Sequence, residues 1–493
     1  MSNGSGRAGL PLAAGGAYPG AHQSAAGTSP VTAVGSRARD LLVGSLLAIS
    51  SFLLSIAVGE VTLRTIYAGG SRYTAGAPGS EPFEHLMFDA PRRLRSRLQT
   101  GPKTPGVPRV MVLGDSITWG YGVRNWEDTW PEQLARRFDG EGRPHEFAVF
   151  AYPAREIDAH LDQWNEWAGR VQPDALVYQW FVNDIELSKH RPAPPEAPWR
   201  RWPWHPLLRR SSYLYSILDE RLGAALPSPE RSYDEYLLED FVPGSWEWTE
   251  FERVFHSLAA KAAEIAPTRI LVLYPQVPFS GAYPLQPIHD RMLSLAHARR
   301  ISIPPSGWTR ESGTLMSRPD SPWRSVVRLP AHAGALALVT GPYYVRRSAD
   351  LTISFATAAA RHDRFATVRL LDAEHHTELA TAPLDEDGDE TDAHSERRIA
   401  HVHLAEPDDL GRDVQFAIGD STDELDIASI DLQVHHDFDV IDLTHPLNRI
   451  NSHVSGFDAH PNPRAHGVIA NAVFDMLSAR ERTRPGPSQT ATH

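Results

Sequence analysis

Between about residue 106 and residue 300, short apolar runs alternate with longer segments in which apolar residues recur every three or four positions. The apolar runs predict strands at 110–113, 145–152, 175–181 and 269–275. The periodic segments predict helices at 125–138, 156–171, 249–266 and 289–300. Strands that alternate with helices in this way are typical of a parallel sheet covered on both faces.

After residue 300 the pattern becomes rich in strands. Short apolar segments separated by turn residues lie at 334–339, 343–347, 350–357, 365–373, 399–404, 414–419 and 427–435. This spacing predicts a small β-sandwich of jelly-roll-like type. The α/β pattern resumes at 438–444 and ends with a helix over 462–482. We therefore expect the sandwich to be inserted into a connection of the α/β domain.

The N-terminal region has a different pattern. Residues 1–36 are rich in Gly, Ala, Ser and Pro, which predicts disorder. From Leu41 to Val58 no residue is charged, so the run is long enough to cross a bilayer. Arg37 and Arg39 precede it, and the positive-inside rule then leaves the N-terminus in the cytoplasm and the remaining chain outside, as in a single-pass membrane protein. A cleaved signal peptide is the alternative.

The predicted organisation is thus an N-terminal anchor, an α/β domain in two parts and an inserted sandwich. The expected segments are a disordered tail (1–36), a transmembrane signal anchor (37–60), a linker (61–105), the first α/β part (106–302), the sandwich (303–436), the second α/β part (437–482) and a disordered tail (483–493). The net charge of −13 argues against a nucleic-acid partner. The chain has no cysteine, which excludes disulfides, thiolate metal sites and a cysteine nucleophile.

One strand end carries a candidate nucleophile. In "VMVLGDSITWGYGV" (110–123), the apolar run stops at Gly114, and Ser116 follows at the carboxyl end of the predicted strand. Ligands bind at this end of the strands in open α/β sheets. Ser116 is either a nucleophile or the cap of the following helix, and this stretch alone does not decide between them.

Two later segments resemble, together with the first, the SGNH/GDSL hydrolase family. "GDSIT" is similar to the first block of that family, "FVND" (181–184) to its Asn-Asp block, and "DAHPNPRAHGVIA" (458–470) to its last block. The resemblance covers roughly 108–300 and 437–480 and implies a three-layer, flavodoxin-like α/β fold. The chain departs from the family pattern at Ala154 in "AYPAR" and at Phe181, where the family usually has glycine.

The resemblance implies a set of catalytic roles. Ser116 would be the nucleophile, His460 the general base and acid, and Asp458 the residue that orients the imidazole. The N–H groups of Ser116 and Ala154 and the side-chain amide of Asn183 would form the oxyanion hole. Asp442 and His445 have the three-residue spacing usual in the family and are a competing acid–base pair, whereas Asp458 and His460 are two residues apart.

The implied function is a membrane-anchored, exported serine esterase for short acyl esters, acetyl in particular, on a polysaccharide or glycoconjugate. An O-acyltransferase that uses the same residues is an alternative, and so is a catalytically silent carbohydrate-binding surface protein. Trp119 and Tyr121 follow Ser116 closely and are candidates for stacking on a sugar ring. No cofactor and no metal is expected. The segment 191–210, rich in Pro, Trp and Arg, fits a substrate lid or a membrane-interface segment.

Overall fold

The computed structural model describes the chain in several stretches. These are residues 31–66, 102–121, 123, 126–187, 198–205, 207–208, 212, 214–215, 218–219, 222, 233–304, 308–317, 325–357, 365–385, 397–405, 411–455 and 458–483. The first 61 residues form one compact unit and the residues from Thr62 onward another.

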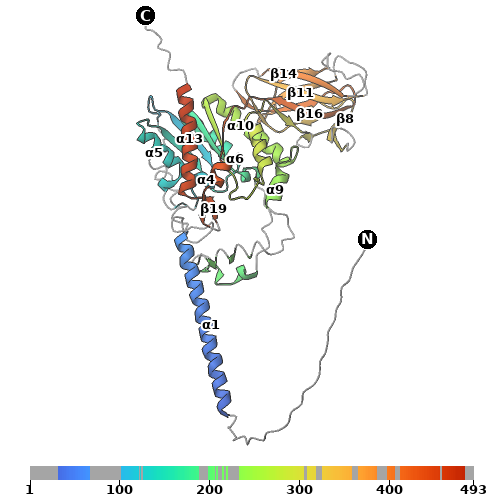
Figure 1. The fold of residues 1–493 in the computed structure, drawn as a ribbon. Coiled ribbons are helices and arrows are strands. Elements are labelled where there is room, and N and C mark those ends of the chain that lie inside the picture. Colours follow the sequence, from blue (N-terminus) through green and yellow to red (C-terminus); the bar gives the residue numbers. More distant parts are fainter. Residues whose placement is uncertain are drawn as a thin grey trace, which may run out of the picture. The chain divides into compact units, whose positions relative to one another are not determined.

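A five-stranded parallel sheet is the centre of the second unit (Figure 1). Its strands are β1 (Arg109–Gly114), β2 (Glu146–Ala151), β3 (Ala175–Trp180), β4 (Thr268–Leu273) and β17 (Asp439–Asp442). Their order in space is β2-β1-β3-β4-β17, and every neighbouring pair is parallel. This is the 2-1-3-4-5 order of flavodoxin-like doubly wound sheets, and the prediction of a parallel α/β sheet is confirmed.

Helices cover both faces of this sheet. They are α5 (Trp130–Gly140), α6 (Ile157–Val171), α10 (Trp246–Ile265), α11 (Gln286–Ala296) and α13 (Pro463–Thr483), with the shorter α4 (Ser116–Trp119), α9 (Tyr233–Asp240) and α12 (Thr444–Asn448) and the 3₁₀ turns η1 (Trp126–Asp128), η2 (Val182–Ile185) and η3 (Pro198–Arg201). Successive residues of a strand point to opposite faces. Accordingly, Val110 and Val112 lie in the apolar cluster of α5 and α13, and Met111 and Leu113 lie in that of α6 and α10.

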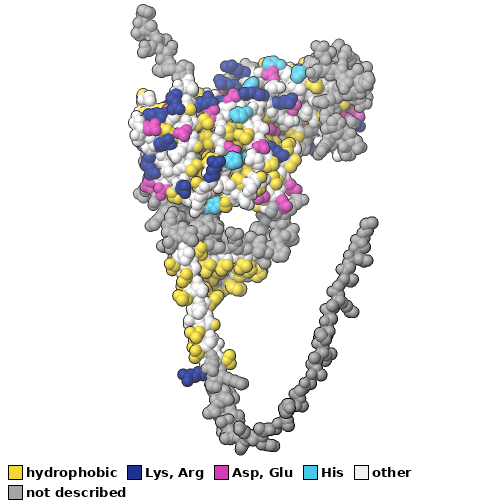
Figure 2. Space-filling model, in the orientation of Figure 1, with side chains coloured by type: hydrophobic (Ala, Val, Ile, Leu, Met, Phe, Trp, Pro, Cys, Tyr) yellow, Lys and Arg dark blue, Asp and Glu magenta, His cyan; other side chains and the backbone are white. Residues whose placement is uncertain are grey.

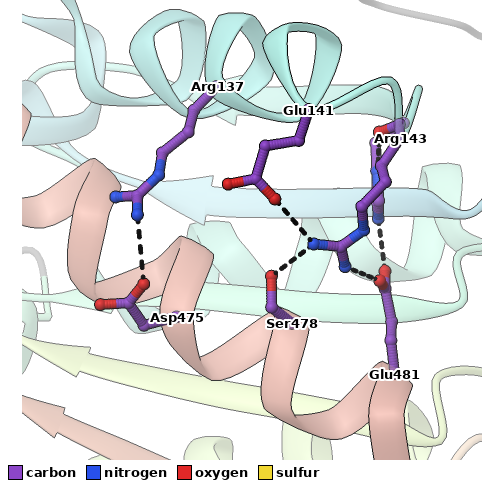
Figure 3. Close-up of polar contacts among 7 residues, drawn as sticks. Arg137, Glu141, Arg143, Asp475, Ser478 and Glu481 are labelled. Carbon is purple, nitrogen blue, oxygen red and sulfur yellow. Dashed lines mark hydrogen bonds and ion pairs between the residues drawn. The ribbon is translucent and has the colours of Figure 1, made fainter.

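Polar contacts join α5 and its following turn to α13 (Figure 3). Arg143 donates to Ser478 Oγ over 3.0 Å and forms an ion pair with Glu481. Arg137 and Asp475 make a second, longer contact of 3.4 Å. Since α13 begins three residues after His460, its attachment to α5 fixes where that histidine enters the fold.

The region between α11 and β17 is a β-sandwich of two antiparallel sheets (Figure 1). One sheet contains β6 (Thr309–Arg310), β9 (Leu338–Val339), β10 (Tyr343–Val345), β12 (Ala366–Asp372), β13 (Glu378–Leu384) and β15 (Arg412–Gly419). The other contains β5 (Arg300–Ile303), β7 (Thr314–Ser317), β8 (Ser325–Leu329), β11 (Ser348–Ala356), β14 (Arg397–Ala405) and β16 (Leu425–Gln433). The predicted sandwich is confirmed, while the exact domain boundaries remain predictions.

The sandwich meets the α/β part along α10. Tyr344 in β10 donates its hydroxyl to Glu264 Oε1 over 2.6 Å. Arg253 donates to the carbonyl of Pro342 over 2.9 Å. His256 contacts the carbonyl oxygen of Tyr344 over 3.0 Å. The buried residues on the α6 and α10 side of the sheet also form one continuous apolar cluster with those of the sandwich, so these two parts share a core.

The helix α1 (Val31–Ile66) begins in the first unit and continues past its last residue, Val61. Its segment Leu41–Leu63 has a mean hydropathy of 2.4 and none of it is buried, which makes it long and apolar enough to cross a membrane. Figure 2 shows hydrophobic side chains gathered along this helix. A signal sequence has the same properties, so the helix alone does not establish an anchor.

Candidate active site

The site lies where three neighbouring strands end at the same edge of the sheet. Gly114, the last residue of β1, is opposite Ala151, the last residue of β2. On the other side of β1, Leu113 is opposite Tyr178 of β3, two residues before that strand ends. The strand order changes direction between β1 and β3, and ligands of doubly wound sheets bind outside the carboxyl ends of the strands at such a switch point.

A sharp turn with two special glycines presents Ser116. A Cβ added to Gly114 would lie 2.2 Å from Thr118 Oγ1, so only glycine allows α4 to approach this closely. Asp115 caps α4, because its Oδ1 accepts the backbone N–H of Ile117 over 2.8 Å. Gly120 ends the helix in the left-handed conformation with φ 80°. Ser116 is therefore the first residue of a helix whose cap is the preceding aspartate.

Ser116 and His460 are brought together from positions 344 residues apart. Ser116 Oγ lies 3.0 Å from His460 Nε2. His460 is in β19 (Asp458–Pro461), a short strand that pairs with β18 (His453–Ser455). The side chain of Asn462 then caps α13 by accepting the N–H groups of Arg464 and Ala465. A hydroxyl in contact with an imidazole nitrogen can lose its proton to that nitrogen while the oxygen attacks a carbonyl carbon.

The two candidate acids are placed differently. The structure includes the backbone of Asp458 in β19, but its side chain lies outside the described part of the chain, so its role stays a prediction. Asp442 Oδ1 accepts the N–H of Thr444 over 2.8 Å and lies 3.6 Å from Nδ1 of the buried His289. Burial alone would raise the pKa of Asp442, but the neighbouring His289 and the hydrogen bonds from Thr444 lower it to about 2. His445 is exposed. Asp442 thus contacts His289 and Thr444.

Ala154 occupies a conformation that normally belongs to glycine. It lies in the turn after β2 with φ 55°, in the left-handed region. The turn is attached to the nucleophile strand, because the N–H of Tyr152 donates to the carbonyl of Gly114 over 3.3 Å. Alanine in this region costs about 1–2 kcal/mol. The backbone at Ala154 therefore has a geometry typical of glycine, and its N–H is that of an ordinary residue.

Asn183 lies in η2, immediately after β3. Its Oδ1 is buried and has no hydrogen-bond partner among the residues that the structure describes. The next residue, Asp184, accepts the hydroxyl of Tyr178 over 2.5 Å. Burial raises the pKa of Asp184 well above its usual value, and the neighbouring charge of Asp115 raises it further. Asp184 therefore holds the turn that presents Asn183.

Sequence reasoning missed a buried network behind the nucleophile. Gln179 Oε1 in β3 accepts both the N–H and the hydroxyl of Thr118, over 3.2 and 2.7 Å. The indole N–H of Trp130 donates to Thr118 Oγ1 over 3.2 Å, and the backbone N–H of Trp130 donates to His466 Nδ1 over 3.1 Å. Burial lowers the pKa of His466 to about 3, which keeps it neutral and able to accept. The network connects α4, β3, α5 and α13.

The two predicted substrate-binding aromatics differ in exposure. Trp119 is 4% exposed, and its ring centroid lies 5.1 Å from that of Tyr152 in an edge-on contact. Tyr121 is half-buried, and its ring centroid lies 4.8 Å from that of His460. Tyr121 is thus the one of the pair that combines contact with the histidine and a partly exposed surface.

Aromatic side chains of the sandwich would have to be exposed to stack on a sugar ring. Trp308, Tyr343 and Tyr344 are all buried. Tyr344 contacts α10, as described above, while Trp323 lies outside the described residues.

Within the described ranges, no group of three or more His, Asp or Glu side chains is arranged to hold a metal ion.

Comparisons with known proteins give weak likenesses. No family model matches the chain, and no curated protein matches it. Among solved structures, an acetylxylan esterase from Geobacillus stearothermophilus is 13% identical, with 38% of this chain and 69% of that one covered and a TM-score of 0.23. A psychrotrophic esterase from Pseudoalteromonas sp. is 12% identical, with 38% and 71% covered and a TM-score of 0.22. A carbohydrate-binding module of a Cellvibrio mixtus lichenase, bound to cellotriose, is 8% identical, with 28% and 98% covered and a TM-score of 0.19. Likenesses of this size do not assign a function to this chain.

Proposed function

We propose that this protein is a membrane-anchored, exported serine esterase of the SGNH/GDSL type that hydrolyses short acyl esters. The contact of 3.0 Å between Ser116 Oγ and His460 Nε2 carries the proposal. It lies at the carboxyl edge of the parallel sheet, beside the β1–β3 switch point, where doubly wound folds bind their ligands. The natural substrate class that we propose is an acetylated polysaccharide or glycoconjugate.

The reaction is a double displacement at the ester carbonyl. Ser116 Oγ attacks the carbonyl carbon while His460 Nε2 takes the hydroxyl proton, which gives a tetrahedral oxyanion. The N–H groups of Ser116 and Ala154 and the amide of Asn183 donate to that oxyanion. His460 then returns the proton to the leaving alcohol and the acyl group stays on Ser116. A water molecule, deprotonated by His460, releases the acid and restores the enzyme. We assign to Asp458 the orientation of the imidazole.

Membrane anchoring is assigned to the apolar segment Leu41–Leu63. The two arginines before it, Arg37 and Arg39, favour a cytoplasmic N-terminus and therefore an extracytoplasmic active site. Substrate selection is assigned in part to Tyr121, because its ring lies against His460 and remains partly exposed. Trp119 would instead support the site from within.

The proposal is tested with a fluorophosphonate probe, which labels activated serines. We expect mass spectrometry to find the phosphonate on Ser116, and the full-length chain to hydrolyse p-nitrophenyl acetate. Ser116→Ala should lose both labelling and turnover, whereas Ser294→Ala, at an exposed serine of α11, should lose neither. Absence of labelling in the folded parent protein would favour the silent sugar-binding alternative. Faster product release on adding a sugar alcohol would favour acyl transfer.

A further inference from the structure

An exposed apolar surface lies on the segment between η2 and α9. We define the Trp/Leu surface as the described apolar residues of this segment with large exposed fractions: Trp202, Trp204, Leu207, Leu208, Leu218 and Leu222. Trp204 is 65% exposed and Leu207 is 62% exposed. Figure 2 shows hydrophobic side chains gathered over this segment. Isolated exposed leucines are common, but a group that includes two tryptophans is not.

Specific contacts hold the segment in shape. The carboxylate of Asp219, itself buried, accepts the indole N–H of Trp199 over 2.8 Å and Nε of Arg200 over 2.9 Å. His205 Nδ1 and the hydroxyl of Tyr215 lie 2.9 Å apart. These contacts tie residues 198–205 to residues 215–219. The Trp/Leu surface therefore belongs to an ordered arrangement that turns its polar groups inward and its apolar side chains outward.

The chemistry of the segment fits the boundary between lipid and water. Tryptophan prefers the headgroup level of a bilayer, where its ring is in apolar surroundings and its N–H can still reach water or headgroups. Leucine supplies apolar area beside it, and further arginines at 201, 209 and 210 in the sequence match the anionic phosphates of lipid headgroups.

We infer that the Trp/Leu surface binds the lipid–water interface of the bilayer that anchors this chain. The inference rests on the anchoring part of the proposed function. The same chain carries the apolar segment Leu41–Leu63, so a bilayer is always present at a high effective concentration. Even a shallow insertion with a low affinity of its own is then sufficient to keep this surface at the bilayer. A second contact of this kind would restrict how the active site is oriented toward substrates near the membrane.

The experiment uses the absence of cysteine in the chain, which makes each introduced thiol the only one. Trp204→Cys and Leu207→Cys are prepared in the full-length protein, labelled with an environment-sensitive fluorophore and reconstituted in bilayer nanodiscs. Leu315→Cys is the matched control, because Leu315 is an exposed apolar residue (42%) of the sandwich. Nitroxide-bearing phosphatidylcholine reports contact with lipid and aqueous iodide reports contact with water.

We expect the lipid nitroxide to quench the labels at 204 and 207 at least about threefold more strongly than the label at 315, with the reverse order for iodide. Equal quenching at the three positions would overturn the inference. Protection of 204 and 207 from both quenchers would also overturn it, because the surface would then pack on protein, as a lid or against a second copy. Retention of the protein in the nanodisc fraction tests the anchor separately, and turnover of p-nitrophenyl acetate tests the esterase separately.

Discussion

Two histidine sites of this protein differ in burial, and the difference explains what each imidazole is able to do. At the sheet edge, His460 is half-buried and its Nε2 lies 3.0 Å from the hydroxyl of Ser116. Between α10 and the sandwich, His256 and His436 are buried and lie 3.0 Å apart through Nδ1 and Nε2. Burial lowers the pKa of His256 to about 4 and that of His436 to about 3.

Counting protons in the buried pair shows why it is structural. The remaining nitrogens face carbonyl oxygens, that of Tyr344 for His256 and that of Leu295 for His436. Three hydrogen bonds in a row would need three protons, whereas two neutral imidazoles carry two. One of the three contacts therefore has no proton while the pair is neutral, and a third proton would place a charge in the shared core. At the sheet edge, the half-buried His460 instead contacts a hydroxyl, which can give up its own proton to the imidazole.

The largest expected effect is on the sheet-edge histidine. His460→Ala removes the group that takes the proton of Ser116, so turnover of p-nitrophenyl acetate should fall by about 10⁴-fold or more. The thermal unfolding midpoint should change little, because the side chain is half-buried. His445→Ala is the control, since His445 is exposed. Loss of turnover in His445→Ala, with activity preserved in His460→Ala, would show that His445 and not His460 is the base.

The next effect concerns the oxyanion. Asn183→Ala removes a side-chain amide that we place toward the tetrahedral intermediate, and kcat should fall by about 10²–10³-fold with KM nearly unchanged. Asn448→Ala is the matched control, because Asn448 bonds to the backbone of Phe279. A rise in KM without loss of kcat would instead place Asn183 in substrate recognition.

The interface pair should instead make stability depend on pH. In the unfolded chain a histidine takes up its proton near pH 6.5, whereas folded His256 and His436 do so only at about 4 and about 3. The unfolded state thus binds more protons between these values, so the free energy of unfolding falls as the pH decreases below 6.5. A group shifted to this extent contributes a loss of about 2 kcal/mol by pH 5. Chemical denaturation at pH 7 and pH 5 measures it.

Adjacent histidines provide a control for this pH dependence. His436 is buried and its neighbour His435 is exposed. His436→Phe should reduce the difference in unfolding free energy between pH 7 and pH 5, and His435→Phe should leave it unchanged. An equal pH dependence in the parent and both variants would show that the buried pair is not the cause, and would remove the contrast between the two histidine sites.

The sequence predicted those parts of the fold in which the local pattern is strong. Strands β1, β3 and β4 are apolar on both faces because helices cover the sheet, and such runs are visible without any alignment. Strand β13 was missed because it consists largely of small residues and a proline and is partly exposed along most of its length. Strand β5 was missed because it has only four residues, begins at the last residue of the predicted helix 289–300 and is followed closely by prolines.

The candidate site was predictable to a similar degree. Ser116 and His460 stand in short motifs with a chemical meaning, and the structure brings their side chains into contact. The support behind them was not predictable, because its bonds join residues far apart in the sequence. Gln179 is 61 positions from Thr118, and His466 is 336 positions from Trp130. No local pattern distinguishes such a glutamine from any other buried polar residue.

The smallest expected effect concerns Ala154, which has a positive φ of 55°. Ala154→Gly relieves about 1–2 kcal/mol of backbone strain but increases the conformational freedom of the unfolded chain by about 0.4–1 kcal/mol. The free energy of unfolding should therefore rise by about 1 kcal/mol or less. Turnover should stay within about threefold of the parent, because the N–H that we assign to the oxyanion hole is present in both residues.

Gln172 offers a matched position for this last comparison. It caps α6 with φ 49°, and its backbone N–H donates to the carbonyl of Ala168. Gln172→Gly should therefore reproduce the stability gain of Ala154→Gly without touching the turn beside Ser116. If Ala154→Gly lowers turnover tenfold while Gln172→Gly does not, the methyl group of Ala154 itself takes part in positioning substrate. Glycine and alanine would then not be equivalent at this turn, and the assignment of a simple backbone donor there would have to be replaced.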